Sequence, residues 1–331
     1  MPTASSPQLF IGVDGGQSAT LTVLVNESGE ILASALTGPC NHIHEPGGLE
    51  RQYKTLRAGY EQVLAAVDPG LASAASVYLG LTGGGHLPTV TSVYETDNLT
   101  LTGDTVSALA GAIPTMIGTI IIAGTGSVAY GRNAQGVEAT VGGRGWFAGD
   151  EGSSYDIARR GHQAVYQAAD GRGPQTLLSA MLLAHYACAD LDELCVKIYS
   201  GLSRDQLART ARIVGKAAAQ GDPVATQIMA AAGEELGRAV AAVLRRLGMV
   251  AEPTPIAPIG GVFKAGEHIT TPLLAHVHKL NDRAHIIQPR FVPAIGAAIL
   301  ALRAAGLTID ETILNNLERT GLHLPMDKFA D

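Results

Sequence analysis

Two short glycine turns are the strongest candidates for chemistry in this sequence. They are Asp14-Gly-Gly-Gln-Ser18 and Gly124-Thr-Gly-Ser127, and each lies between two β-rich runs. Glycine has no Cβ atom, so such a turn can approach a phosphate closely and point several backbone N–H groups at its oxygens. The alternative is that both turns are ordinary structural hairpins. Neither is followed by the Gly-Lys-Ser/Thr of a P-loop, and no strand-to-helix GxGxxG motif is present, so two hairpins would have to hold the phosphates.

Asp104 is the first candidate for acid–base chemistry. It lies in Thr102-Gly-Asp-Thr105, after a β-rich stretch that includes Leu99–Leu101 and before an alanine-rich helix. A carboxylate at the end of a strand can accept the proton of a substrate hydroxyl group. A second interpretation is that Asp104 caps the helix that begins near Val106.

The second candidate is a pair of carboxylates, Asp150 and Glu151, in the glycine-dense segment Gly142–Gly152 just before a helix. Such a density of glycine is unusual for an ordinary loop, which is the alternative interpretation. The composition favours a polar ligand that approaches the backbone, with Asp150 accepting hydrogen bonds from sugar hydroxyl groups.

The elements that would position these residues repeat along the chain. The runs Leu9–Val13, Thr20–Val25 and Ile31–Leu36 predict a β-meander, and the turn Asn26–Gly29 joins the last two as a hairpin. Near Pro114 a second unit begins with the same order of strand, glycine turn and strand. Two related halves, each with a glycine hairpin, are what a nucleotide cleft between duplicated domains requires. Chance similarity of two short hairpins is the alternative.

Periodicity and capping signals predict the remaining elements. Ser203 and Gln206 form a capping-box pattern, and Asp222-Pro223 predicts the start of a long amphipathic helix that ends at Gly248. The other predicted elements are a helix over Gly48–Val67, a buried strand over Val77–Leu81, a strand over Ile256–Ile259 and a helix over Pro293–Leu302.

The length of 331 residues suits two lobes rather than one core. We expect an N-terminal lobe over 1–113 and a C-terminal lobe over 114–306, with a cleft between them. The last helix, near 294–306, is able to pack back on the first lobe. The polar, amphipathic tail over 307–331 has no assigned role.

Composition restricts the class of partner. Only 16% of the residues are charged and the formal net charge is −7, so no basic field exists to attract nucleic acid or an anionic membrane. The N-terminus lacks a basic region followed by a long apolar run, which predicts a cytoplasmic protein. Cys40, Cys188 and Cys195 are an odd number without CxxC spacing, so we expect neither a disulfide framework nor a zinc site.

The motifs occur in an order that resembles one known family. They are DGGQSAT (14–20), Asn41-His42, TGDTVSALAG (102–111), IIIAGTGSVAYGR (120–132), GGRGWFAGDEGSSYDIARRG (142–161), QGDP (220–223), PIGGVFKAG (258–266) and PAIGAA (293–298). The set resembles the N-acetylglucosamine kinase branch of the actin-like sugar kinases, which shares a family with the benzoyl-CoA reductase activase type ATPases. The resemblance runs from about Phe10 to Leu302. It implies a two-lobed actin-like ATPase fold of the α/β class, with duplicated ribonuclease H-like domains and an interdomain cleft.

The resemblance also implies a role for each matching residue. Asp104 would be the catalytic base, and the sugar contacts would be Asn41, Asp104, Gly145 and Asp150. Asp14 would act on Mg²⁺, usually through water. The ATP-binding residues would be Gly15, Gly16, Gln17 and Ser18 in the first turn, Gly124, Thr125, Gly126 and Ser127 in the second, Ala218 near adenine, and Gly260, Gly261 and Lys264 at the adenosine motif. From sequence alone, Asn41 could equally be a turn residue and Lys264 a solvated surface lysine.

Two positions depart from the family pattern. Gln17 stands where a third glycine is common, and Arg144 stands where N-acetylglucosamine kinases have tryptophan, with Trp146 two residues later. As a candidate substrate-binding residue, Arg144 could recognise an anionic substituent such as the lactyl carboxylate of N-acetylmuramic acid. Alternatively it could pair with Asp150 or Glu151 as a structural clamp.

The activity that the resemblance implies is ATP- and Mg²⁺-dependent phosphorylation of the 6-hydroxyl group of N-acetylglucosamine or a close relative. Glucosamine and N-acetylmuramic acid are alternative substrates. A redox-activase ATPase and a non-enzymatic actin-like sugar sensor are alternative classes of protein. Such relatives are often dimers, so we also expect a homodimer, with no nucleic-acid or membrane partner.

Overall fold

The computed structural model describes residues 8–41, 43–67, 74–94 and 96–324. The chain forms two compact units: the first unit is Met1–Met116 with Gln288–Asp331, and the second unit is Ile117–Ile287. The segment from 288 onward therefore belongs to the first unit, whereas the expectation placed 114–306 in the second lobe and left open whether the last helix packs back on the first. The reason is that the helix in this segment packs against strands of the first unit.

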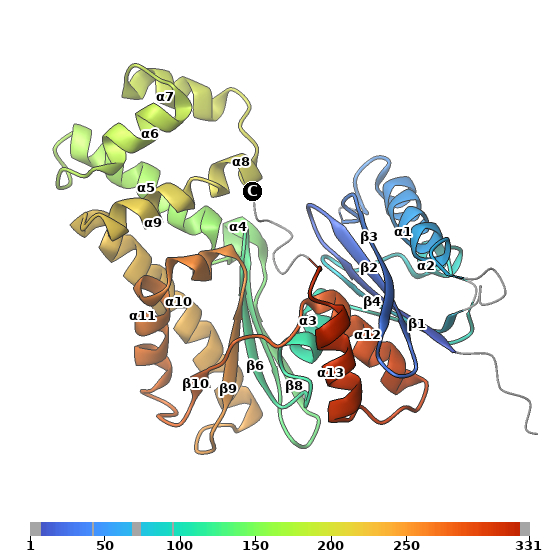
Figure 1. The fold of residues 1–331 in the computed structure, drawn as a ribbon. Helices are drawn as coiled ribbons and strands as arrows, with labels where there is room; N and C mark the ends of the chain where they lie inside the picture. The colour runs from blue at the N-terminus through green and yellow to red at the C-terminus, as the bar shows by residue number, and fades with distance from the viewer. Residues whose placement is uncertain (1–7, 42, 68–73, 95, 325–331) are drawn as a thin grey trace, which may run out of the picture. The chain divides into compact units, whose positions relative to one another are not determined.

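The first unit is built on a five-stranded sheet in the order β3-β2-β1-β4-β5 (Figure 1). β2 is antiparallel to both β1 and β3, whereas β1, β4 and β5 are parallel. The strands are β1 (Leu9–Gly15), β2 (Thr20–Asn26), β3 (Ile31–Thr37), β4 (Ala74–Leu81) and β5 (Leu99–Thr102), and the helices are α1 (Gly48–Leu64), α2 (Leu87–Thr91), α3 (Asp104–Ala112), α12 (Pro293–Ala304) and α13 (Glu311–Thr320).

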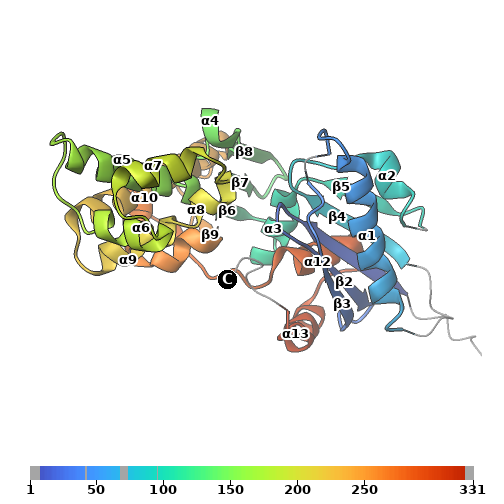
Figure 2. The ribbon, with the colours of Figure 1, turned by 90° about the horizontal axis from the view of Figure 1, so that it is seen from above.

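The alternation of side chains along β1 explains the two layers of helix in this unit. Leu9, Ile11 and Val13 join the core that contains α1, whereas Phe10 joins the core that contains α12 and α13. Because successive side chains of a strand point to opposite faces, one buried strand serves both layers. Figure 2 shows α1 and α12 on opposite sides of these strands. The tail without an assigned role thus contributes α13 to this core.

Helix α12 lies close enough to its neighbours that only small residues fit. A Cβ atom on Gly12 would meet the backbone of Ala298, and one on Gly296 would meet the carbonyl oxygen of Ser107 and the amide nitrogen of Gly111. The predicted Gly296-Ala-Ala298 pattern is therefore the surface through which α12 contacts β1 and α3.

The second unit contains another five-stranded sheet, in the order β10-β9-β6-β7-β8. Its elements are β6 (Gly118–Ala123), β7 (Ser127–Arg132), β8 (Glu138–Gly142), α4 (Gly145–Ala148), α5 (Ser154–Ala169), α6 (Leu178–Tyr186), α7 (Leu191–Tyr199), α8 (Arg204–Ala208), α9 (Ala211–Ala219), α10 (Pro223–Leu247), β9 (Pro255–Ile259), the 3-10 helix η2 (Gly261–Ala265), α11 (Glu267–Val277) and β10 (His285–Ile286).

The two sheets have the same topology. In each, the first strand forms an antiparallel hairpin with the second, the third strand extends the hairpin, and the fourth and fifth pair in parallel beside the first. Chance similarity of two short hairpins does not explain a match over five strands. The predicted duplication is confirmed.

The long amphipathic helix is also confirmed. Helix α10 starts at the cap Asp222, with Pro223 as its first residue, and ends at Gly248 in the left-handed conformation. Its apolar side covers strands of the second sheet, with Leu236, Val240 and Val243 in the same core as Ile121. The capping box of Ser203 and Gln206 is present at the start of α8.

Within the described ranges, the structure contains no helix that is both long enough and apolar enough to cross a bilayer.

The packing of α12 gives a test of the fold. We expect Gly296→Ala to lower the free energy of unfolding by about 1–3 kcal/mol, because the added methyl group overlaps backbone atoms of α3. Gly215→Ala is the matched control. Gly215 lies inside helix α9 with open space around it, so alanine should raise stability by about 0.5–1 kcal/mol. Urea unfolding followed by circular dichroism measures both, and equal effects would contradict the packing of α12.

Candidate active site

Four strands of the first sheet end at one edge. Because β2 is antiparallel to both β1 and β3, β3 runs in the same direction as β1, as do the parallel strands β4 and β5. Asp14 pairs with Gly80 in this register, and Gly80 pairs with Thr102. The amide of Thr82 donates to the carbonyl oxygen of Gly15 over 2.8 Å. The residues that follow these strands therefore gather at the same edge.

Asp104 lies at this edge as the first residue of α3. The hydroxyl group of Thr82 donates to its carboxylate oxygen Oδ2 over 2.5 Å. The cap position of α3 is Gly103, not Asp104. The helix-cap interpretation of Asp104 therefore fails, and its carboxylate is oriented by a residue that follows a neighbouring strand.

The first glycine turn closes the β1–β2 hairpin, with the amide of Gly16 donating to the carbonyl oxygen of Ala19 over 2.9 Å. Gly15 is required there, since a Cβ atom would meet the sulfur of Cys40. The turn also contains Gln17 and the exposed Ser18.

Asn41 lies near the same turn. It is buried, and the guanidinium of Arg51 donates to its carbonyl oxygen over 3.0 Å. The amide of Cys40 donates to the carbonyl oxygen of Gly16, which brings this segment to the first turn. The first unit thus assembles Asp14, the turn, Asn41 and Asp104 around one sheet edge. His42 of the quoted motif lies outside the described residues.

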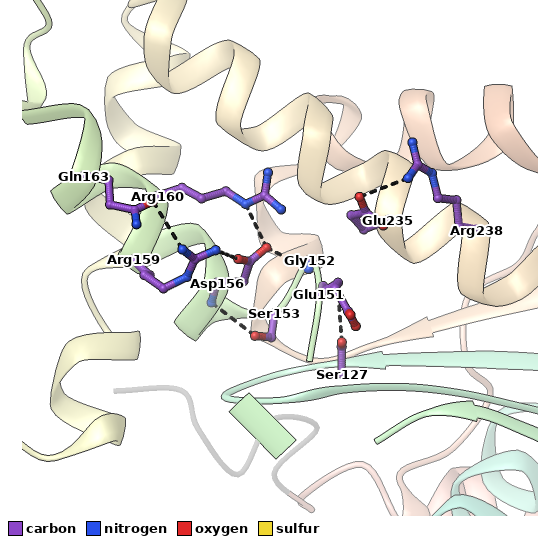
Figure 3. Close-up of polar contacts among 10 residues, drawn as sticks. All are labelled: Ser127, Glu151, Gly152, Ser153, Asp156, Arg159, Arg160, Gln163, Glu235 and Arg238. Atoms are coloured by element: carbon purple, nitrogen blue, oxygen red, sulfur yellow. Dashed lines mark hydrogen bonds and ion pairs between the residues drawn. The ribbon is translucent and has the colours of Figure 1, made fainter. Parts of the chain in front are cut away.

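The second glycine turn is tied to the glycine-dense loop 142–153. The amide of Ser154 donates to the carbonyl oxygen of Gly124, and the amide of Gly143 to that of Ser127. The hydroxyl group of Ser127 donates to the carbonyl oxygen of Glu151 over 2.7 Å (Figure 3). The turn and the loop therefore form one structure, as expected if both approach a single ligand.

Asp150 connects the two segments through its side chain. Its carboxylate oxygen Oδ1 accepts the amide of Ser127 over 3.2 Å, and Oδ2 lies 3.5 Å from a guanidinium nitrogen of Arg204. A Cβ atom on Gly126 would meet this carboxylate, so glycine is needed there. The backbone of Asp150 has φ 58°, a left-handed conformation that is uncommon for a residue with a side chain.

Asp156 anchors the end of the loop from the first turn of α5. Its carboxylate accepts the amide of Gly152 and pairs with Arg159 and Arg160 at 2.8 and 2.9 Å (Figure 3). Burial alone would raise the pKa of Asp156, but the hydrogen bonds from both arginines and from Gly152 outweigh it and hold the pKa below its usual value. The loop therefore ends on an ionised, fixed group.

Arg144 does not form the expected clamp. It is exposed just before α4, and no ion pair to Asp150 or Glu151 exists in the part of the chain that the structure describes. Arg144 lines a hollow of about 350 Å³. Glu151, Glu235 and Arg238 are among the other lining residues. Glu235 pairs with Arg238 at 3.3 Å (Figure 3). Gly145 begins α4 with φ 81°.

The motif that the resemblance assigns to adenosine, Gly260-Gly261-Val-Phe-Lys264, follows β9 at the edge where β6 also ends. Gly260 has φ 110°, and a Cβ atom there would meet the carbonyl group of Ala123, so the motif lies directly against the second turn. Lys264 is exposed on η2, next to Gly261. Ala218 is buried on α9, in the core that also contains α10 and Val262 of η2.

Two residues of the site were not predicted. Thr82 directly follows the predicted strand Val77–Leu81 but carried no predicted role, and its contact with Asp104 spans 22 positions. No sequence pattern predicted a role for Arg204, because 54 positions separate it from Asp150 and no periodicity links an arginine to a distant loop.

Comparisons with known proteins identify the relatives of this chain. The sequence profile of the BadF/BadG/BcrA/BcrD ATPase family matches residues 11–301. The N-acetylmuramic acid/N-acetylglucosamine kinase of Clostridium acetobutylicum is 29% identical over 299 residues, covering 88% of this chain and 97% of the relative. The N-acetyl-D-glucosamine kinase of Dictyostelium discoideum is 27% identical over 317 residues, covering 90% and 99%.

A solved structure supports the same assignment. A crystal structure from Chromobacterium violaceum, provisionally assigned as an N-acetylglucosamine kinase, matches with a TM-score of 0.69 at 28% identity and covers 89% of this chain and 99% of that one. The expected fold class, an α/β ATPase fold of the actin-like type, is confirmed by this likeness and by the repeated sheet topology. The chain belongs to the BadF/BadG/BcrA/BcrD ATPase family.

Proposed function

We propose that the protein is an ATP-dependent amino-sugar kinase that phosphorylates the 6-hydroxyl group of N-acetylglucosamine or a close relative. Membership in an ATPase family supports the use of ATP. The names of the two kinase relatives support an N-acetylated amino sugar as the acceptor. Within the structure, one observation carries the proposal: the hydroxyl group of Thr82 donates to Asp104 at the edge where β1, β4 and β5 end.

Asp104 is the proposed base. Its carboxylate accepts the proton of the sugar 6-hydroxyl group as the oxygen attacks phosphorus. The hydrogen bond from Thr82 fixes the orientation of the carboxylate before the substrate arrives. A preorganised base avoids the cost of reorienting in the transition state, which is how a fixed polar group contributes to rate.

The two glycine turns are proposed to bind phosphate. Their backbone N–H groups can point at phosphate oxygens because Gly15, Gly16, Gly124 and Gly126 leave the approach open. Asp14 fits a magnesium site by its chemistry, since it offers hard carboxylate oxygens at the end of β1 beside the first turn. Bound Mg²⁺ would neutralise charge on the phosphates. Ala218, Gly260, Gly261 and Lys264 stay predictions for the adenosine end of ATP.

Sugar recognition is assigned to Asn41, Gly145 and Asp150. The carboxylate of Asp150 is held at both oxygens, so it can accept hydroxyl groups in a fixed direction. The tight connection between its loop and the second turn supports a site in which sugar and phosphate are recognised by one rigid segment. A cytoplasmic location and a homodimer also stay predictions.

Replacing the base tests the mechanism. We expect Asp104→Asn to lower kcat by about 10²- to 10⁴-fold, because asparagine cannot accept the proton. ATP binding and thermal stability should be unchanged. Asp97→Asn, at an exposed aspartate of the same unit, is the control and should keep full activity. If Asp104→Asn keeps more than about a tenth of the wild-type rate, Asp104 is not the base.

A metal and thiol experiment separates the kinase from a redox activase. Chelation of Mg²⁺ should abolish sugar-dependent ADP release, and added Mg²⁺ should restore it. Replacing Cys188 and Cys195 together with alanine should leave the release largely unchanged, because an activase cluster would need thiolate ligands whereas a kinase does not. An iron–sulfur absorbance in anaerobically purified protein, lost in this double variant, would instead support the activase.

N-acetylmuramic acid is the second candidate substrate. The observation that favours it is the position of Arg144, which is exposed in the glycine-dense loop 142–153, called the sugar loop below. Arg144 makes no ion pair with Asp150 or Glu151 among the described residues. A guanidinium group can bind a carboxylate through two parallel hydrogen bonds.

Substitution of Arg144 tests this candidate. We expect Arg144→Trp to lower kcat/KM for N-acetylmuramic acid by about 10- to 100-fold, the effect of one charged hydrogen bond, while sparing N-acetylglucosamine. The neutral sugar is the internal control in the same assay. Equal losses on both sugars, or a wild-type protein without activity on the acidic sugar, would remove the recognition role of Arg144.

A further inference from the structure

Arg204 makes contacts that bring a distant helix to the sugar loop. It is the first residue of α8, directly after the cap residue Ser203 and inside the capping box that Ser203 forms with Gln206. Its guanidinium lies 3.5 Å from Oδ2 of Asp150 and 5.9 Å from the ring centre of Tyr155, on α5. The capping box fixes where α8 begins, and this fixes the backbone position from which the Arg204 side chain extends.

Among the described residues, one hydrogen-bond donor of Arg204 is left without a partner. Its Nε atom is buried, and no hydrogen-bond acceptor for it exists within the described ranges. A buried donor without an acceptor lowers stability, since water has been removed and nothing replaces it. Natural proteins retain such costs mainly where function requires them. The position of Arg204 is therefore better explained by its ion pair with the carboxylate of Asp150.

Groups from two other segments hold the carboxylate of Asp150. Its left-handed backbone, at φ 58°, lies outside the conformations that side-chain-bearing residues prefer. The amide of Ser127 fixes Oδ1, and Arg204 is the cation beside Oδ2. A carboxylate has about four acceptor directions, so both oxygens can still accept a substrate hydroxyl group.

We propose that Arg204 is a positioning residue for sugar recognition, which orients the carboxylate of Asp150 without contacting the reacting atoms. This inference rests on the proposed function. It predicts that Arg204 governs the affinity for the sugar and not the affinity for ATP or the rate of phosphoryl transfer. A purely structural role would lower the fraction of folded protein, which reduces the apparent kcat and leaves the sugar Kd and both KM values unchanged.

The single tryptophan of the chain offers a direct readout of sugar binding. Trp146 lies on α4 in the sugar loop, and its ring contacts Tyr155, whose ring lies under Arg204. Sugar binding at Gly145 and Asp150 should change its fluorescence. Titration with N-acetylglucosamine therefore measures the sugar Kd without turnover, and steady-state kinetics measure KM and kcat on the same samples.

The first comparison is Arg204→Gln against wild type. We expect the sugar Kd and KM to rise by about 10-fold or more, while the KM for ATP and kcat stay within about threefold. Arg204→Lys should lie between the two, because lysine keeps the charge but loses the planar group that lies over Tyr155. Arg209→Gln, at an exposed arginine at the end of α8, is the control and should match wild type.

A double-variant cycle then tests whether Arg204 acts through Asp150. With Asp150→Asn already present, Arg204→Gln should change the sugar Kd by less than about twofold. Losses that multiply in the double variant would overturn the proposal, as would an Arg204→Gln protein that binds sugar as well as wild type. A wild-type protein that neither binds nor phosphorylates any amino sugar would instead refute the proposed function itself.

Discussion

Parallel pairing of β1 with β4, and of β4 with β5, forces three strands of the first sheet to end at one edge. The site depends on this constraint, because Asp14, Thr82 and Asp104 are each at or just past the end of one of those strands. If β4 ran antiparallel to both of its neighbours, Thr82 would lie at the opposite edge from Asp14 and Asp104. The hydrogen bond from Thr82 to Asp104 follows directly, since it joins residues that follow adjacent parallel strands.

Parallel strand pairing also brings two segments together in the second unit. Strands β6 and β9 are parallel, so the second glycine turn and the segment that begins at Gly260 start at the same edge, where Gly260 contacts the backbone of Ala123. The turn is then joined to the loop that carries Asp150, through Ser127 and Glu151. Ion pairs outside the turn, from Arg204 to Asp150 and from Arg159 and Arg160 to Asp156, complete the loop. The glycine residues allow the turn and the loop to approach each other closely, and the ion pairs fix the orientation of the two aspartate carboxylates.

Much of this could be predicted from the sequence because it depends on local signals. The duplicated hairpins, the capping box at Ser203, the start of α10 at Asp222 and its end at Gly248 each rest on residues only a few positions apart. The return of α12 to the first unit was left open, because backbone contact between Gly296 and Gly111 depends on packing and not on periodicity. Arg204 could not be predicted at all, since an ion pair across 54 positions leaves no local pattern. The clamp from Arg144 to Asp150 was plausible by sequence distance, but Arg204 is the cation beside that carboxylate.

The central claim is that the protein phosphorylates the 6-hydroxyl group of an amino sugar. Product analysis tests it most directly: the purified protein is incubated with ATP, Mg²⁺ and each of a panel of sugars, ADP release is followed, and the position of the new phosphate is assigned by ³¹P–¹H NMR. The account predicts ADP release that requires an amino sugar and a product in which phosphorus couples to the protons on C6. ADP release at the same rate without sugar, or a phosphate on any other oxygen, would contradict it.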